Sequence, residues 1–294
     1  MGGLRRGRVE TMVIFMSRLF IFGFGYSALA LAGQLRSLGW EVAGTTRQPG
    51  KIADLRQLGF TVYPFSREVP LGAGIAALAD FPYILHSVPP DDLGDPVYDQ
   101  HSGDIVDQLP GLQWFGHLST TGVYGDHNGA RVDETTLCTP TNARTIARYK
   151  IEQQWQELQQ RCGVPVHIFR LAAIYGPGRN MLANLRAGKT PRFLQPDHVI
   201  NRIHVEDIAQ ALLASMHKPA PGSVYNLADD CPARQNEVVA HTAQLLGVDI
   251  PAAPEPDNAI AFADRKIVDN AKMKRELGVR LKFPGYRDGL AAVK

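Results

Sequence analysis

The sequence predicts an α/β fold, a doubly wound parallel sheet with a smaller mixed α/β lobe at its C-terminal side. Two observations favour this fold. Short apolar runs of strand length alternate with stretches of helical periodicity through the first 171 residues. Beyond residue 171 this alternation breaks down, and glycines and prolines mark irregular loops. Repeated strand–helix–strand units imply right-handed crossovers and a parallel sheet that helices cover on both faces.

The N-terminal part supplies strands and helices in alternation. Leu19–Phe22 is a short apolar run before a glycine, which is typical of a buried parallel strand. Ala28–Leu38 carries leucines at helical spacing, and Gly39 follows as a helix-terminating residue. The further predicted strands are Trp40–Thr46, Phe60–Phe65, Tyr83–His86, Trp114–Ser119 and Val166–Leu171. The further predicted helices are Ile52–Leu58, Ile75–Ala79, Tyr98–Leu109 and Asn142–Gln160.

The domain boundaries are expected where the pattern changes. Residues 16–171 and about 200–226 are assigned to the sheet domain, and residues about 172–199 and 227–294 to the smaller lobe. Helices are predicted near Glu206–Met216 and Asn236–Leu246, with a proline-rich link at Pro251–Pro256. Residues 1–15 are polar and rich in glycine and arginine, so we expect a disordered tail there.

Composition excludes several classes of protein. Of 294 residues, 45% are hydrophobic and 20% charged, which is typical of a globular protein with a sizeable core. The net charge is only +2, so no basic face for nucleic acid is expected, and no apolar run is long enough to span a membrane. The three cysteines are scattered without metal-ligand spacing, which favours the cytoplasm and argues against a metal site.

The turn after the first strand has the spacing of a phosphate-binding loop. It reads Gly23-Phe-Gly25-Tyr26-Ser27-Ala28, follows a predicted buried strand and begins a helix. Gly23 permits the tight turn, Gly25 lets a diphosphate approach the backbone, and Ala28 keeps the helix close to the sheet. Free N–H groups at the helix start would then hold the anion. This context predicts a Rossmann domain that binds a nicotinamide dinucleotide.

The end of the second predicted strand favours NADP(H) over NAD(H). NAD-selective sites usually place an acid there, where it bonds the ribose hydroxyls. This strand ends without a carboxylate at Thr46-Arg47. We expect Arg47 to bind a 2′-phosphate, helped by Thr46 and Lys51. The alternative is that Arg47 is a solvated surface arginine.

Beyond this loop the sequence resembles the extended short-chain dehydrogenase/reductase superfamily, the NAD(P)-dependent epimerase/dehydratase family. Leu118-Ser-Thr-Thr-Gly-Val-Tyr-Gly-Asp126 is similar to the family's fifth-strand motif, and Phe169-Arg-Leu-Ala-Ala-Ile-Tyr-Gly-Pro-Gly178 to its sixth-strand cofactor and substrate segment. Arg202–Ile208 and Gly222–Asp230 resemble two later signatures. The four stretches occur in the family's order and cover nearly the whole chain.

The resemblance implies a catalytic Ser/Thr and a Tyr-x-x-x-Lys pair, and this chain departs from that pattern. Thr120 falls at the Ser/Thr position, with Ser119 beside it at the cofactor. One alignment register puts Ile146 at the tyrosine and Lys150 at the lysine; the other puts Arg144 and Arg148 there. Neither register supplies a tyrosine, which identifies the chain as an atypical member of the superfamily.

Two tyrosines and the loop after the fourth strand are further candidates. Tyr124 and Tyr175 are predicted near the carboxyl ends of strands, where such sheets bind ligands. Tyr124 is a candidate proton donor and Tyr175 a cofactor contact, with packing as the alternative that we favour for both. In the family, the segment His86-Ser87-Val88 makes backbone contacts to the dinucleotide, and we expect His86 to be a neutral residue lining the cleft.

Four arginines are candidates for binding a small-molecule substrate. Arg144 and Arg148 are four residues apart and so share one helix face. They either bind an anion of the substrate or cofactor, or form a solvated face that pairs with Glu152. Arg179 and Arg202 are candidate phosphate contacts for a nucleotide-linked substrate.

Two functions follow from these expectations. The first is an NAD(P)-dependent oxidoreductase, or an epimerase/dehydratase-like enzyme, acting on a hydroxyl or carbonyl, with a nucleotide-sugar among the candidate substrates. The second is a non-catalytic NAD(P)-binding sensor, which the absent tyrosine would explain. Many relatives pair through a helix like Asn142–Gln160, so a homodimer is a further expectation.

Overall fold

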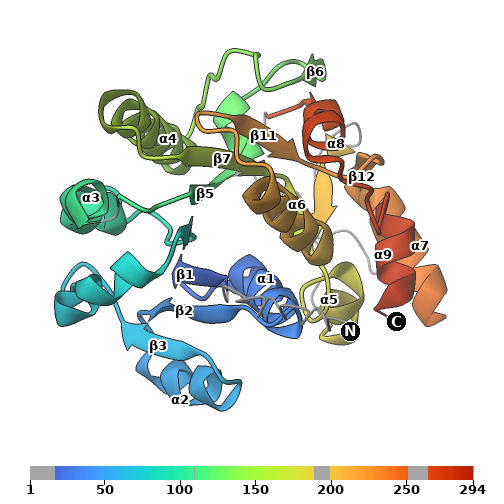
Figure 1. Cartoon of the computed structure of the whole chain (residues 1–294). Coiled ribbons are helices and arrows are strands. Elements are labelled where there is room, and N and C mark those ends of the chain that lie inside the picture. The colour runs from blue at the N-terminus through green and yellow to red at the C-terminus, as the bar shows by residue number, and fades with distance from the viewer. Residues whose placement is uncertain (1–16, 109, 189–198, 251–263, 294) are drawn as a thin grey trace, which may run out of the picture.

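Seven parallel strands form one central sheet, which confirms the predicted fold class (Figure 1). The computed structural model describes residues 17–108, 110–188, 199–250 and 264–293. The strand order is β11-β7-β5-β4-β1-β2-β3, so the order reverses between β1 and β4. The bounds are β1 (Arg18–Phe22), β2 (Glu41–Thr46), β3 (Thr61–Pro64), β4 (Tyr83–His86), β5 (Trp114–Thr120), β7 (Val166–Leu171) and β11 (Val224–Leu227).

Helices cover both faces of this sheet (Figure 1). In β1, Leu19 and Ile21 point to one apolar cluster and Phe20 and Phe22 to the other, as the two-residue period of a strand requires. The first cluster includes side chains of α1 (Tyr26–Ser37), α2 (Pro49–Gln57) and α6 (Val205–His217). The second includes side chains of η1 (Gly72–Asp80), α3 (Pro96–Gln108) and α4 (Ala143–Cys162).

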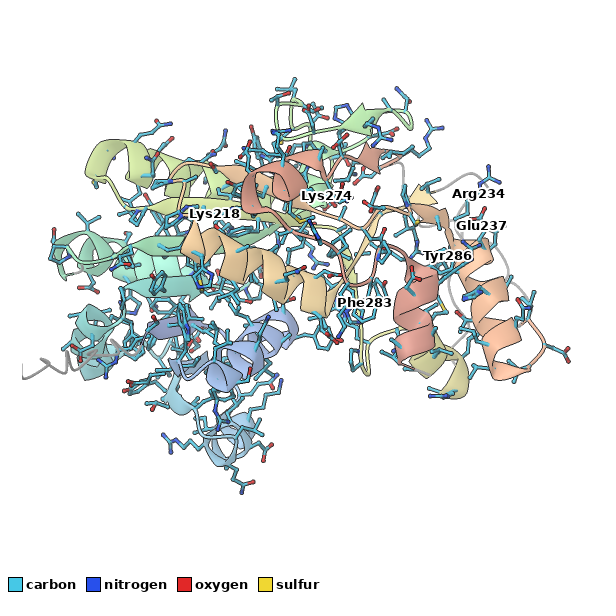
Figure 2. The ribbon with its side chains drawn as sticks, turned by 45° about the vertical axis from the view of Figure 1, so that its right-hand side comes forward. Lys218, Arg234, Glu237, Lys274, Phe283 and Tyr286 are labelled. Carbon is cyan, nitrogen blue, oxygen red and sulfur yellow. The ribbon has the colours of Figure 1, made fainter. Side chains whose placement is uncertain are left out.

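The remaining elements are short and lie mostly beyond β7. A small apolar cluster joins Leu182, Val238 and Tyr286 from three different helices. Figure 2 shows Tyr286 beside the helix that carries Glu237. The bounds are η2 (Thr121–Tyr124), β6 (Arg131–Val132), β8 (Ala173–Tyr175), α5 (Met181–Arg186), β9 (Val199–Ile200), β10 (Arg202–His204), β12 (Ala233–Arg234), α7 (Gln235–Leu246), β13 (Ile267–Val268), α8 (Ala271–Leu277) and α9 (Tyr286–Ala292).

The segment after β10 ties the C-terminal part of the chain to α6. The Asp207 carboxylate accepts hydrogen bonds from the backbone N–H groups of Lys282 and Phe283, at 2.7 and 3.1 Å. The Phe283 ring, labelled in Figure 2, lies 3.9 Å from the His204 ring, centroid to centroid. His204 and Asp207 therefore serve to hold the segment at Lys282 and Phe283 against the start of α6.

Predicted and observed elements agree closely through β7. The predicted helix at Ile75–Ala79 is part of a 3-10 helix. Strand β11 was not among the predicted strands, although it pairs with β7 in the central sheet. The predictions for residues 1–15 and for Pro251–Pro256 lie outside the described residues. The assignment of segments to two domains stays a prediction. No helix in the described ranges is both long and apolar enough to cross a membrane.

Candidate functional site

A cavity of about 900 Å³ lies beyond the carboxyl ends of β5 and β7, at the side of the sheet where β1 gives way to α1. This is the position at which open parallel sheets bind ligands, and the volume is in the range of cofactor and substrate sites, roughly 300–1,000 Å³. Its walls come from the start of α1, the loop after β4, the end of β5, the first turns of α4, and the β7–β8 segment.

The phosphate-binding loop forms one wall of the cavity. Gly23 has φ +90°, and a Cβ added there would lie 3.1 Å from Val88 Cγ2 and 3.3 Å from the Ser87 backbone. Gly25 precedes α1 in extended conformation, and no side chain caps the helix. Gly25, Tyr26 and Ser27 line the cavity, whereas Ala28 is buried against the sheet. The free N–H groups of the first turn of α1 are therefore available to a phosphate group.

Tyr26 connects this loop to the segment after β8. Its hydroxyl donates a 2.9 Å hydrogen bond to the Pro177 carbonyl oxygen. The Arg179 guanidinium lies 5.6 Å from the centroid of the Tyr26 ring, and both residues line the cavity. A Cβ at Gly176 would lie 2.7 Å from the Tyr26 hydroxyl, so the close approach needs glycine. Arg179, predicted as a substrate contact, thus lies on the same wall as the phosphate-binding loop.

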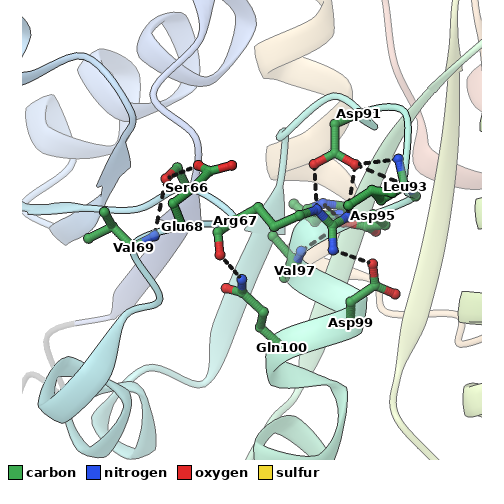
Figure 3. A network of polar contacts seen from close by, with 12 residues as sticks. Ser66, Arg67, Glu68, Val69, Asp91, Leu93, Asp95, Val97, Asp99 and Gln100 are labelled. Atoms are coloured by element: carbon green, nitrogen blue, oxygen red, sulfur yellow. Dashed lines mark hydrogen bonds and ion pairs between the residues drawn. The ribbon is translucent and has the colours of Figure 1, made fainter.

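An arginine-centred network fixes the loop after β4 (Figure 3). The same loop supplies Ser87 and Pro89 to the cavity. Arg67 donates to both carboxylate oxygens of Asp91, at 2.6 and 2.9 Å, and lies 2.9 Å from Asp99. Asp91 also accepts the backbone N–H groups of Leu93 and Gly94. The hydrogen bonds from Arg67 lower the pKa of Asp91, which keeps it ionised near neutral pH.

Thr120, predicted to bind the reacting oxygen, lines the cavity at the end of β5. Its side-chain oxygen accepts a 3.1 Å hydrogen bond from Gly122 N–H, so its hydroxyl proton stays free to donate. A Cβ at Gly122 would lie 2.8 Å from Thr145 Cγ2 and 3.4 Å from Thr120 Oγ1. Thr120 and the first turn of α4 are therefore close neighbours across Gly122.

Beneath Thr120 lies a buried charged network. Ser119 also lines the cavity, and its hydroxyl donates to the Glu152 carboxylate. Arg170 donates to both oxygens of that carboxylate, at 2.8 Å or more, and its guanidinium lies 4.8 Å from the centroid of the Tyr124 ring. The sequence left open that Arg144 and Arg148 pair with Glu152. Glu152 is paired with Arg170 instead.

Helix α4 turns Arg144 and Arg148 into the cavity. Arg144, Thr145 and Arg148 line the cavity from one face of the helix, and Thr141 and Asn142 line it just before the helix begins. Ile146 and Lys150 are exposed and lie off this face. The residues of the second alignment register, Arg144 and Arg148, therefore line the cavity, whereas Ile146 and Lys150 of the first register do not. The spacing alone could not decide this, because both registers matched equally good landmarks.

Several predicted site residues are buried away from the cavity. The Tyr124 side chain is fully buried, and its hydroxyl donates a 2.8 Å hydrogen bond to Asn226 Oδ1. Burial raises its pKa to about 12. Tyr175 donates to the Gly285 carbonyl oxygen and packs edge-on against His204. Arg202 donates to the backbone carbonyls of β9 and β12 and to Gln235. All three side chains make contacts within the fold. Their positions do not support a catalytic role for Tyr124, a cofactor contact by Tyr175 or a substrate contact by Arg202.

His86 is also buried, so the prediction that it lines the cleft was wrong. It lies opposite His117 in the β4–β5 register, and their Nδ1 atoms are 2.6 Å apart. Its Nε2 lies 3.2 Å from Asp95, whose other oxygen accepts a hydrogen bond from the Trp155 indole. Burial, followed by the neighbouring His86, holds the pKa of His117 well below its usual value. The sequence predicts that β4 ends at His86, but it does not predict that the His86 side chain is buried.

The end of β2 lies outside the cavity walls described above. Thr46 is buried, and its hydroxyl oxygen accepts the Gln48 N–H. Arg47 and Lys51 are exposed. β2 pairs with β1 in the sheet, so this strand end neighbours the phosphate-binding loop.

Four residues that line the cavity were not predicted from the sequence. Thr121 lies in a short 3-10 helix, Asn142 and Thr145 lie at the start of α4, and Asp264 comes from a distant segment. Within the described ranges, no group of His, Cys, Asp and Glu side chains has the composition of a metal site.

Comparison with known proteins adds independent evidence. Residues 105–228 match a family model described as the NAD dependent epimerase/dehydratase family. Protein YeeZ of Escherichia coli (strain K12) is 30% identical over 281 residues, which cover 92% of this chain and 97% of YeeZ. A solved structure of a functionally unknown conserved protein from Silicibacter pomeroyi DSS is 42% identical, with a TM-score of 0.86 over 94% of this chain and 98% of the other. This chain belongs to the NAD dependent epimerase/dehydratase family.

Relatives in the epimerase/dehydratase family that have named activities share less sequence with this chain. UDP-glucose 4-epimerase from Thermotoga maritima is 20% identical, with a TM-score of 0.79 over 94% of this chain and 96% of the other, which shows the common fold. A trifunctional UDP-glucose 4,6-dehydratase/epimerase/reductase of Arabidopsis thaliana is 26% identical over 182 residues, 56% of this chain and 26% of that protein. The resemblance seen in the sequence motifs is thus confirmed.

Proposed function

We propose that this protein is an NAD(P)-dependent oxidoreductase of the epimerase/dehydratase type that acts on a hydroxyl or carbonyl group. One observation carries the proposal: the phosphate-binding loop and Thr120 line the same cavity at the switch point of the sheet. The glycines of the loop and the adjoining Ser87 leave room for a diphosphate against the helix start. Relatives that bind UDP-glucose or UDP-glucuronic acid with NAD share the fold, so nucleotide-sugars are the first substrates to screen.

The residues of the cavity divide the chemistry between them. The bound nicotinamide cofactor supplies or accepts the hydride. The Thr120 hydroxyl donates a hydrogen bond to the reacting oxygen, while Gly122 N–H holds the threonine in place. The Tyr124 hydroxyl is buried and donates to Asn226, so we assign it no part in the reaction, and the proton that accompanies the hydride passes to or from water.

A non-catalytic dinucleotide-binding protein is the second candidate. Arg144 and Arg148 line the cavity from α4, and one of the two alignment registers puts them at the family's Tyr-x-x-x-Lys pair. A guanidinium stays protonated at physiological pH and cannot replace the tyrosine in proton transfer. Screening carbonyl compounds and nucleotide-sugars for a change in nicotinamide absorbance separates the two candidates: turnover supports the enzyme, and binding without turnover supports the sensor.

Gly25→Ala tests the cofactor site directly. A Cβ at Gly25 has its nearest neighbour, Ser87 Oγ, at 3.6 Å, which is ordinary van der Waals contact, so the fold should tolerate it. The methyl group would nevertheless occupy the diphosphate's approach to the backbone. We expect NADPH and NADH to bind at least about tenfold more weakly, as measured by nicotinamide fluorescence. Gly33→Ala on the exposed side of α1 is the matched control and should leave both affinities unchanged. Equal binding by Gly25→Ala and the natural protein would contradict this cofactor site.

The preference for NADP(H) over NAD(H) rests on Arg47 at the end of β2. No carboxylate occupies Gly44-Thr45-Thr46-Arg47, so the usual partner of the ribose hydroxyls is missing. We expect Arg47→Ala to weaken NADPH binding by roughly tenfold and NADH binding little, because only NADPH carries the 2′-phosphate. Arg56→Ala, at an exposed arginine near the end of α2, is the control. An unchanged NADPH/NADH ratio in Arg47→Ala would leave the choice between the cofactors without a structural basis.

A further inference from the structure

Two guanidinium groups, of Arg144 and Arg148, face the cavity from α4, and no described carboxylate forms an ion pair with either of them. Within the described part of the chain, Arg144 forms no hydrogen bond and no ion pair. Arg148 donates one hydrogen bond, to the Leu118 carbonyl oxygen at 3.2 Å, and among the described residues its other N–H groups have no acceptor. The two side chains are one helical turn apart and can reach a common group.

The nearby carboxylates of the described ranges already have other partners. Glu152 is bound by Arg170 and Ser119, and Asp95 lies against His86 and the Trp155 indole. Asp264, which also lines the cavity, lies 3.4 Å from the Thr141 hydroxyl and 4.0 Å from Lys266 Nζ. Burial, followed by the neighbouring Arg144, lowers the pKa of Arg148. An anion placed between the two arginines would relieve this repulsion.

A cofactor diphosphate would find its partners on a different wall of the cavity. The free N–H groups at the start of α1 and the Arg179 guanidinium lie there, beside Tyr26. The α4 arginines instead flank Thr145, whose methyl group approaches Thr120 across Gly122. Their position is therefore next to the group that binds the reacting oxygen.

We propose that Arg144 and Arg148 bind an anionic group, a carboxylate or a phosphate, that the substrate carries close to its reacting hydroxyl or carbonyl carbon. This inference rests on the proposed function, because it places the anion relative to Thr120. It narrows the substrates to hydroxy or oxo compounds with an acidic group near the reacting carbon. Guanidinium groups suit this role, because each can bind a carboxylate or phosphate through two parallel hydrogen bonds and so orient it.

The test is anion binding by the cofactor-loaded protein. Malonate, inorganic phosphate and the uncharged malonamide are titrated separately by calorimetry in a low-chloride buffer with saturating NADP⁺. We expect malonate or phosphate to bind and malonamide not to bind. Arg144→Gln and Arg148→Gln should each weaken the anion about tenfold to hundredfold, the loss expected for a charge-assisted hydrogen bond. Arg275→Gln, an exposed arginine outside the cavity, is the matched control.

The outcomes separate this inference from the proposed function. Whichever anion binds more tightly assigns the group as carboxylate or phosphate. If NADP⁺ binds but neither anion does, or if the glutamine variants bind anions like the natural protein, the arginine site is refuted while the cofactor site stands. If NADP⁺ itself does not bind, the proposed function fails, and the same titrations on the cofactor-free protein decide the arginine site. Arg148→Lys, which keeps the charge, replaces Arg148→Gln if that variant fails to fold.

Discussion

At the scale of single residues, the Thr120 hydroxyl is the group on which the proposed chemistry depends. Thr120→Val keeps the shape but removes the hydroxyl and the acceptor for Gly122 N–H. Loss of one such hydrogen-bond donor typically costs about 10²–10³ in turnover. We expect a fall in kcat of that order, measured at the nicotinamide absorbance band, with NADPH affinity unchanged. Thr120→Ser restores the hydroxyl and should recover most of the activity; equal turnover by the valine variant would remove Thr120 from the mechanism.

The residues that the sequence could predict are those whose role depends on backbone position. Gly23 and Gly25 come just after β1, and Thr120 ends β5, so their place at the edge of the sheet is fixed by the strand pattern. Tyr124 and His86 also follow that rule, yet both are buried, because side-chain direction and depth depend on packing against segments distant in sequence.

At the scale of secondary structure, α1 contains a glycine that the fold does not need. Gly33 is exposed in the middle of the helix, and a Cβ there meets no atom within 4 Å. Alanine at such a position loses less conformational entropy on folding. We expect Gly33→Ala to raise the free energy of unfolding by about 0.5–1 kcal/mol, measured by urea denaturation followed by circular dichroism. Gly176→Ala should do the opposite, because its Cβ would collide with the Tyr26 hydroxyl and Val205, both at 2.7 Å.

The elements that the sequence missed are those without a local signal. Strand β11 has four residues and becomes a strand by pairing with β7, more than fifty residues earlier in the chain. The two-residue strands β6, β9, β12 and β13 are likewise defined by long-range pairing. Other segments, by contrast, show their burial in their own sequence, as the continuous apolar run Leu19–Phe22 does by filling both faces of the sheet.

At the scale of the whole molecule, the cavity is bounded by loops that distant contacts hold in place. Arg67 fixes the loop after β4 through Asp91 and Asp99, and Tyr26 joins the phosphate-binding loop to Pro177. These ties preorganise the walls of the cavity before any ligand binds, so binding energy is not spent on ordering them.

The acid stability of the molecule should depend on histidines that the fold keeps neutral. Burial lowers the pKa of His167 to about 4, and its Nε2 accepts the Ala220 N–H at 2.8 Å. The unfolded chain binds a proton near pH 6.5, whereas the folded form resists it until about pH 4. The unfolded state therefore holds more protons in this window, and stability falls as the pH is lowered from about 6.5 to about 4.

We expect His167→Gln to flatten this part of the pH profile, because glutamine can still accept the Ala220 N–H but does not titrate. The acid-induced loss should shrink by roughly 3 kcal/mol at pH 4, the value of a shift of this size. Urea unfolding at pH 7.5, 6, 5 and 4 measures it, with His217→Gln as the control because that side chain is exposed at the end of α6. Parallel profiles for the natural protein and His167→Gln would show that His167 takes up its proton at the same pH in the folded and unfolded states. The next histidines to test would then be His117 and His204, whose pKa values burial also lowers.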